Sequence, residues 1–351
     1  SKEVWVRGIT VDSGVTLTLS GLLLKQHYNG ASFFYTNNGI ISGSGNLKIV
    51  LYDVSKTIDF GSVNCRVTVE LSSVAAESRV LSTTGDIPLG TSLTVLSDHA
   101  TYTCTLDLNG YDLECDSLTI GNRGILKNTS TSTSSLTADS ITVSGTSSLF
   151  DTTDIDFDKS KVVGQTLTWS AESAGNASNA SNWSLLRAPF YNDNIVFNDT
   201  SVVDCTWDVG LDSLGTFTMA SGYTGRVTQA ATMYVAGVNK QDGQLYLSNS
   251  YHLYCSGDFI ETGGYHESFG IVHMISDNTT IGLFHVNAFD WLYVDANINC
   301  NKISLNKLTI SENKTLTIND TVGLYYSGAT PFLYNYGEIN GNGKLEIYLR
   351  Y

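Results

Sequence analysis

The chain has 351 residues and a formal net charge of −15, and only 15% of its residues are charged, well below the roughly 25% of an ordinary soluble domain. Its hydrophobic content of 42% is too high for a disordered chain. The excess of acidic residues excludes the basic surface that binding to nucleic acid or to anionic lipid requires. No run of about 18 apolar residues is present, so we expect no membrane insertion.

Low charge combined with abundant Ser, Thr, Asn, Gly and Tyr is typical of proteins of the cell surface. The first residues contain no apolar stretch like that of a signal peptide. We therefore expect an extracellular or cell-surface protein whose signal peptide has already been removed.

Apolar and polar residues alternate along most of the chain, which is the pattern of β-strands. In chain order the clearest alternations lie at residues 15–19, 47–51, 67–71 and 345–349. No segment sustains the 3.6-residue apolar period of a helix. The sequence therefore predicts an all-β chain with more than about 40% strand, against a usual share of 20–25%.

A short unit of apolar residue, Thr and apolar residue recurs, and its spacing selects the kind of β fold. It occurs at residues 93–95, 118–120 and 141–143, so that successive copies start 25 and 23 residues apart. One coil of a parallel β-helix uses about that much chain, and stacked coils repeat the same strand once per coil. We therefore predict a parallel β-helix, or β-solenoid.

The two ends of the chain carry copies of one module. Residues 28–52 match residues 326–350 without a gap at an offset of 298, and residues 9–18 match 308–317 with one residue of slippage. Acidic residues interrupt the strand pattern at 151–165. We expect two solenoid halves, 1–164 and 165–351, or one continuous domain.

Residues 168–235 have a recognisable pattern, with Trp169, Asn182-Trp183-Ser184, Asp193-Asn194-Ile195, Cys205-Thr206-Trp207 and Gly222-Tyr223-Thr224-Gly225. This segment resembles β-helical repeat modules of large bacterial and archaeal cell-surface proteins. With the Gly-, Ser- and Thr-rich strands elsewhere, the chain resembles an archaeal sheath or S-layer protein of the methanogen type. The resemblance implies an extracellular structural role.

Six cysteines are present without any CxxC motif or zinc-like spacing: Cys65, Cys104, Cys115, Cys205, Cys255 and Cys300. An even number in a chain placed outside the cell makes one to three disulfides an expectation. Cys104 and Cys115 flank the turn at Asn109-Gly110, which would bring them together in a hairpin or in adjacent coils. Buried free thiols and a bridge between chains are the alternatives.

Two polar clusters are candidate sites. Asp154, Asp156 and Asp158 would share one face of a strand and offer oxygen ligands to calcium, although they lack the EF-hand pattern. A solvated acidic strand is the alternative. Asn176, Asn179 and Asn182 each begin an Asn-x-Ser triplet in a polar loop, where a glycan would fit.

No catalytic motif emerges from the sequence. The chain has no HExxH, no Gly-His-Gly signature with paired Asp and no phosphate-binding loop, so we predict neither an enzyme nor a cofactor. The expected function is a structural subunit that self-assembles into a surface sheath, layer or filament. Its partners would be further copies of itself, joined end to end through residues 3–19 and 308–351 or laterally, and surface glycans. The alternative is a carbohydrate-active or carbohydrate-binding β-helix, such as a lyase, a hydrolase, an adhesin or a viral spike.

Overall fold

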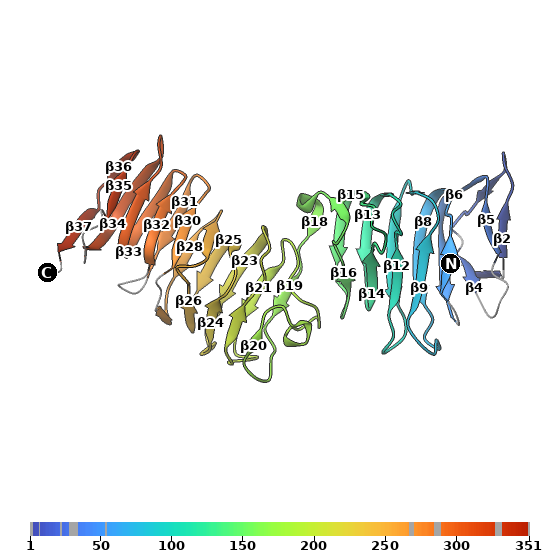
Figure 1. Cartoon of the computed structure of the whole chain (residues 1–351), viewed down its shortest axis with the longest axis horizontal. Helices are drawn as coiled ribbons and strands as arrows, with labels where there is room; N and C mark the ends of the chain where they lie inside the picture. Colours follow the sequence, from blue (N-terminus) through green and yellow to red (C-terminus); the bar gives the residue numbers. More distant parts are fainter. Residues whose placement is uncertain are drawn as a thin grey trace. The chain divides into compact units, whose positions relative to one another are not determined.

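The computed structural model describes residues 3–6, 8–21, 23–27, 34–52, 55–266, 270–283, 289–326 and 332–349. Strands account for 57% of the described residues and stack into a β-solenoid of about 14 turns, which confirms the predicted fold class. The chain divides into two compact units, residues 1–163 and 164–351, each of which is described by itself. Every named strand pair among the described residues is parallel, as coil-on-coil stacking requires (Figure 1).

The first unit contains one large sheet and two smaller ones. The large sheet consists of β1 (Glu3–Val6), β3 (Thr16–Thr18), β4 (Leu23–His27), β6 (Ile40–Leu51), β8 (Ser62–Leu71), β10 (Ile87–Pro88), β11 (Ser92–Ser97), β13 (Leu113–Ile120), β15 (Ser134–Val143), β17 (Ile155–Phe157) and β18 (Val162–Val163). The second sheet consists of β7 (Lys56–Ile58), β9 (Arg79–Thr83), β12 (Cys104–Asp107), β14 (Gly124–Lys127) and β16 (Leu149–Phe150). The remaining pair is β2 (Gly8–Val11) with β5 (Phe34–Asn37), and η1 (Lys159–Lys161) is a short 3₁₀ helix.

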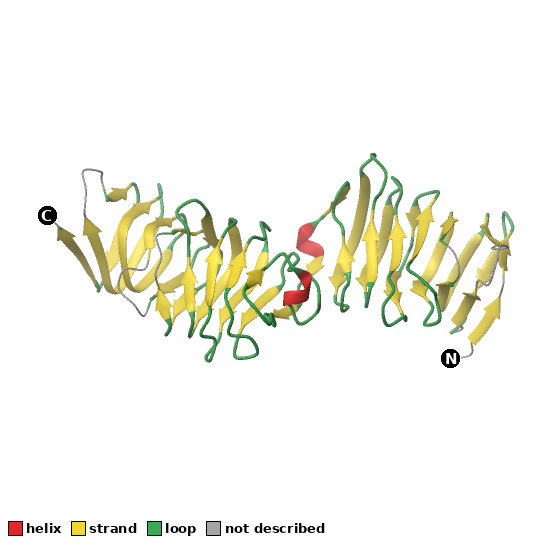
Figure 2. Cartoon of the chain, turned by 60° about the horizontal axis from the view of Figure 1, so that its bottom comes forward, coloured by secondary structure: helices red, strands yellow, loops and turns green. Residues whose placement is uncertain are grey.

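The second unit is built in the same way from two sheets. The larger consists of β19 (Thr166–Thr168), β21 (Asn194–Phe197), β23 (Leu214–Met219), β25 (Met233–Lys240), β27 (His252–Cys255), β28 (Phe259–Glu261), β30 (Ile271–Met274), β31 (Thr279–Gly282), β32 (Phe289–Val294), β33 (Ile298–Ile310), β34 (Thr315–Tyr326), β35 (Leu333–Asn335), β36 (Glu338–Gly341) and β37 (Lys344–Leu349). The smaller consists of β20 (Gly175–Asn176), β22 (Cys205–Trp207), β24 (Arg226–Gln229), β26 (Gln244–Tyr246) and β29 (Tyr265–His266), and η2 (Ala180–Asn182) is a second 3₁₀ helix (Figure 2).

The recurring triplets stack in register, as their spacing predicted. Thr94 pairs with Thr119, and Thr119 pairs with Thr142 on the next coil. The apolar residues on either side of each threonine point into the coil and are buried, whereas the threonines lie at the surface. Because successive residues of a strand face opposite sides, alternation along the sequence becomes a column of apolar side chains inside the coils.

The modules at the two chain ends have the same backbone hydrogen bonds. Ile40 N donates to Val15 O (2.9 Å), and Glu338 N donates to Lys314 O (2.8 Å) at the matched positions. Strand register agrees too, since Thr16 pairs with Ile40 as Thr315 pairs with Glu338. The sequence repeat is therefore a repeat of structure. Residues 28–33 and 327–331 of the matched segments lie outside the described residues.

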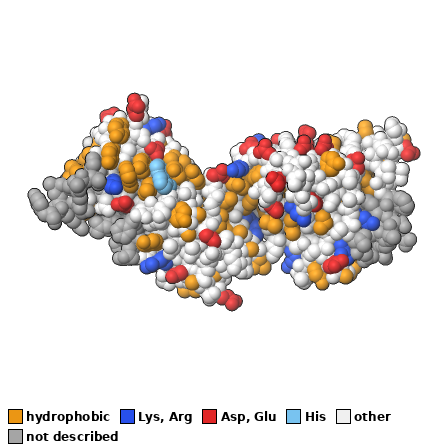
Figure 3. All heavy atoms as spheres, viewed as in Figure 1, with side chains coloured by type: hydrophobic (Ala, Val, Ile, Leu, Met, Phe, Trp, Pro, Cys, Tyr) orange, Lys and Arg blue, Asp and Glu red, His pale blue; other side chains and the backbone are white. Residues whose placement is uncertain are grey.

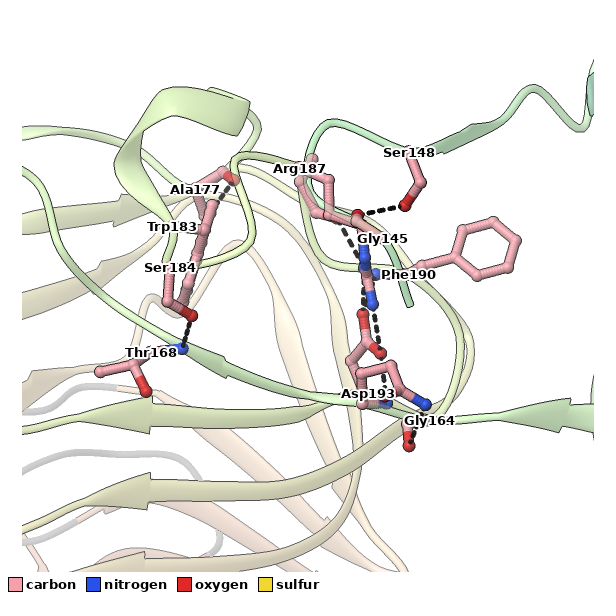
Figure 4. A network of polar contacts seen from close by, with 12 residues as sticks. Gly145, Ser148, Gly164, Thr168, Ala177, Trp183, Ser184, Arg187, Phe190 and Asp193 are labelled. Carbon is pink, nitrogen blue, oxygen red and sulfur yellow. Dashed lines mark hydrogen bonds and ion pairs between the residues drawn. The ribbon is translucent and has the colours of Figure 1, made fainter. Parts of the chain in front are cut away.

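The segment at 168–235 that carries the family resemblance forms an aromatic core in the second unit. Trp169, Trp183 and Trp207 are fully buried, and their ring centroids lie 5.1 to 6.2 Å apart. Each indole N–H donates to a backbone carbonyl, for example Trp183 Nε1 to Ala177 O at 2.7 Å (Figure 4). A buried indole N–H without an acceptor would cost desolvation free energy, and these hydrogen bonds avoid that cost.

A buried ion pair fixes the chain beside this core. Arg187 meets Asp193 through two hydrogen bonds, with Nη1 2.6 Å from Oδ2 and Nη2 3.0 Å from Oδ1 (Figure 4). The same carboxylate accepts the backbone N–H groups of Gln165 and Phe190. The two hydrogen bonds from the Arg187 guanidinium and the two from backbone amides satisfy a carboxylate that solvent does not reach.

Short polar side chains at the corners tie each coil to the next. Asn194 Oδ1 accepts Thr216 N (2.9 Å), Asp258 Oδ1 accepts Thr280 N (2.7 Å), and Asn297 Oδ1 accepts Thr315 N (2.9 Å). In each case the donor lies one coil further along the chain. Asn and Asp favour turns, and here they also satisfy amides that the sheet ladders leave unpaired.

Candidate functional site

A column of aromatic side chains runs along one face of the second unit, and we call it the aromatic ladder. Its positions pair coil by coil: Tyr234 on β25, Tyr254 on β27, His273 on β30, Tyr293 on β32, Thr309 on β33 and Tyr334 on β35. Ring centroids are 4.5 Å apart for Tyr234–Tyr254, 4.5 Å for Tyr254–His273 and 4.3 Å for His273–Tyr293. Parallel strands in register, about 4.8 Å apart, place equivalent side chains directly over one another, which produces this stack.

Trp291 fills the gap that Thr309 leaves in the aromatic ladder. The indole lies 4.8 Å from the Tyr293 ring and 6.0 Å from the Tyr334 ring, nearly parallel to both. Its Nε1 donates to Thr309 Oγ1 at 2.8 Å, and Lys307 Nζ lies 4.8 Å from the indole centre. The stacked rings therefore cover one another's faces, and they present mainly edges and hydroxyl groups to solvent.

A chain of hydrogen bonds crosses the ladder at His273. His252 Nδ1 lies 2.9 Å from His273 Nε2, and His273 Nδ1 lies 2.8 Å from Asp295 Oδ2. Ser311 Oγ donates to Asp295 Oδ1 at 2.5 Å. An ionised carboxylate only accepts, so a neutral His273 donates through Nδ1 and accepts at Nε2 from His252 Nδ1. Burial lowers the pKa of His273, and the hydrogen bond to Asp295 opposes that shift.

An open hollow of about 710 Å³ lies beside this hydrogen-bonded chain. It is lined by His273, Tyr293, Asp295, Thr309, Ser311, Glu312 and Tyr336. Tyr336, between β35 and β36, is 65% exposed. The face of the second unit seen in Figure 3 shows histidine lying among hydrophobic side chains. The volume is within the range of about 300–1,000 Å³ that is usual for ligand pockets.

The six cysteines form no disulfide, so the expectation of one to three bridges is not met. All six are free and buried. The strand neighbours of Cys115, Cys255 and Cys300 are other residues, such as Ala138, Met274 and Ile318. Cys104 and Cys115 lie on strands of different sheets, β12 and β13. Burial raises the pKa of each thiol, to about 11 for Cys255 and about 12 for Cys115. The thiols fill the column as small apolar groups.

Asp154, Asp156 and Asp158 are not brought together as metal ligands. All three are exposed; Asp154 occupies a turn with φ of 55°, and Asp158 caps η1 by accepting Ser160 N at 2.9 Å. A hydrogen bond from the Ser160 side chain, together with this backbone bond, lowers the pKa of Asp158. Within the described part of the chain, no group of three or more His, Cys, Asp and Glu side chains is arranged to hold a metal. Of the three, only Asp156 lies in a strand, β17, so the expectation that they share one strand face is wrong.

The three candidate glycosylation residues surround η2. Asn176 and Asn179 are exposed, and Asn182 is partly buried. Asn179 caps η2 by accepting Ser181 N at 3.1 Å, while Asn182 Nδ2 donates to Asn176 O at 3.0 Å. A glycan would be attached to this same Nδ2 atom, which at Asn182 is engaged in that bond, so the exposed Asn176 and Asn179 are the better acceptors. Their modification stays a prediction.

The aromatic ladder was missed by the sequence analysis, although a signal for it exists. Residues 233–235, 253–255, 272–274 and 292–294 repeat the apolar–x–apolar triplet with Tyr or His in place of Thr. In this column, the triplet Leu308-Thr309-Ile310 has threonine at its central position. A search that allowed an aromatic at the central position would have found these four triplets, but not Trp291 or Tyr334.

Comparison of the chain with protein-family models, with curated proteins and with solved structures finds no match. The described residues include no helix with the length and apolar character needed to cross a bilayer.

Proposed function

We propose that this chain is a structural subunit of an extracellular surface layer, and that it assembles by stacking coil on coil with further copies of itself. One observation carries the proposal. Ile49 on β6 and Ile347 on β37 occupy the same position in the two copies of the module, but Ile49 is 0% exposed and Ile347 is 48% exposed. The tail coil therefore presents a surface that its counterpart buries.

The difference in exposure follows from strand pairing. β6 pairs with β4 on one side and with β8 on the other. Among the described residues β37 pairs only with β34, which corresponds to β4 in the second copy. The edge of β37 that no described strand covers, with exposed Ile347 and Tyr348, is the tail face of the proposed contact. Such an edge invites a further parallel strand.

The complementary head face lies on the first coil. Residues 307–310 of β33 pair with β32. In the first copy of the module, these residues correspond to β2. Among the described residues β2 pairs only with β5. Nearby Val4 and Trp5 are also exposed. A tail face on a head face is a heterologous contact, which gives a ring or a filament.

The surface setting of the proposal is supported by composition and by the resemblance of residues 168–235 to modules of prokaryotic surface proteins. A methanogen-type sheath or S-layer is the specific form that we propose. The proposal gives the chain no catalytic activity and no cofactor. Antibodies against the chain should label intact cells of the source organism without permeabilisation; labelling only after permeabilisation would contradict the surface location.

The assembly is tested with the 351-residue chain by sedimentation velocity over a range of concentrations. We expect association that increases with concentration and that the Ile347→Lys substitution abolishes, because a charge would enter the buried junction. The matched control is Val202→Lys, at a residue that is 45% exposed in a turn of the same unit. A wild-type chain that stays monomeric, or two variants that associate equally, would contradict the model.

A further inference from the structure

We propose that the hollow beside His273, Tyr293 and Thr309 of the aromatic ladder binds a neutral saccharide, a function that goes beyond assembly. Tyr293 is covered by His273 at 4.3 Å and by Trp291 at 4.8 Å, so it offers its edge and hydroxyl. Tyr336 also lines the hollow, and it is 65% exposed, so a large part of its ring is open to solvent. One exposed ring suits the apolar C–H face of a pyranose, whereas an ammonium group is usually held by several ring faces.

The polar lining supplies both donors and acceptors. Thr309 Oγ1 accepts the indole N–H of Trp291, which leaves its own O–H free to donate. Ser311 Oγ donates to Asp295, which leaves its lone pairs free to accept. Glu312 adds an exposed carboxylate that accepts. Sugar hydroxyls both donate and accept, so this mixture fits them.

Charge selects among saccharides. Asp295 and Glu312 both line the hollow, and the whole chain carries a net charge of −15. A uronate or a sulfated sugar would be repelled by these carboxylates. A neutral hexose polymer carries no such penalty. A second hollow of about 310 Å³ is lined by Tyr234 and Tyr254, further along the same ladder. We therefore expect a linear oligosaccharide to bind better than a monosaccharide.

The two modules provide a test substitution that preserves the fold. Tyr336 corresponds to Asn38 in the first copy, and both make the same backbone bond: Tyr336 N donates to Ile310 O at 3.0 Å, and Asn38 N donates to Val11 O at 2.8 Å. Tyr336→Asn therefore removes the ring and installs a residue that this turn already accepts. Tyr251→Ala removes another exposed tyrosine of the same unit outside the hollow, and serves as the control.

Binding is measured by isothermal titration with cellohexaose, chitohexaose and mannohexaose, with hexagalacturonate as the anionic probe and choline as the cationic probe. The Ile347→Lys background keeps the protein unassembled, so that failure here is distinct from failure of the assembly proposal. We expect at least one neutral hexasaccharide to bind, Tyr336→Asn to weaken it at least tenfold, and Tyr251→Ala to leave it unchanged. The proposal is overturned by binding of choline or hexagalacturonate alone, by no binding of any probe at millimolar concentration, or by equal weakening in both variants.

Discussion

Gly43 in β6 and Gly341 in β36 occupy the same position in the two copies of the end module, and both have a positive φ, 115° and 109°. A Cβ on Gly43 would collide with the carbonyl oxygen of Leu19, and a Cβ on Gly341 would collide with that of Ile318. Leu19 and Ile318, which carry these carbonyl groups, each lie on the coil that precedes the glycine. The glycine therefore sets how closely two coils approach, and the repeat preserves this constraint at both chain ends.

Gly341→Ala is expected to lower the free energy of unfolding by about 1–3 kcal/mol, because alanine is strained at this φ and its methyl group meets a backbone carbonyl. Urea unfolding followed by circular dichroism measures the change. Gly210→Ala is the control, since nothing lies within 4 Å of a Cβ at that position. Equal effects of the two substitutions would show that coil spacing does not depend on Gly341.

The second prediction concerns the buried ion pair of Lys240 and Glu261. Both side chains are 0% exposed, and Lys240 Nζ lies 2.5 Å from Glu261 Oε1 and 2.7 Å from Gly263 O. Lys240→Met leaves a carboxylate in the core and should destabilise the second unit by about 3–5 kcal/mol. The double variant Lys240→Met, Glu261→Leu should recover most of that loss in thermal unfolding. A double variant less stable than the single one would contradict this account.

Stability should fall on acidification because of His273. Burial lowers its pKa below the ordinary histidine value of about 6.5, so the unfolded chain binds the proton first. This contribution to stability is fully present above about pH 6.5 and is lost as the pH falls towards the folded pKa. His273→Tyr places a third tyrosine between Tyr254 and Tyr293 and removes the titration. Its urea midpoint should change less than that of the wild type between pH 7 and 5; identical profiles would exclude His273 as the source.

The cysteines should be unreactive until the chain unfolds. Burial and a raised pKa keep the thiolate population low at each site, for instance at Cys255 with a pKa of about 11. An Ellman assay at pH 8 should detect almost no thiol in the native protein and six in urea without reductant. Fewer than six in urea would indicate that disulfides form after all.

The fold class could be predicted from sequence because it depends on local patterns. Alternation at residues such as 67–71 reports which side chains face the interior, and the triplets at 93, 118 and 141 repeat at nearly the length of one coil. The end modules could be recognised in the sequence because the same structural constraint requires the same residue in both copies, as at Gly43 and Gly341. Each of these signals lies within a short stretch of chain or at one constant offset.

The candidate site could not be predicted in this way, because it depends on which residues the coils bring into one column. Successive positions of the aromatic ladder are 20, 19, 20, 16 and 25 residues apart. Turns of different length absorb these differences, so no fixed period reveals the column. The cysteines illustrate the same limit, since their number suggested bridges but the register places other side chains beside them. The sequence by itself determined the stacked coils, and only the tertiary structure decided which side chains meet, because strand register is set by pairing across coils.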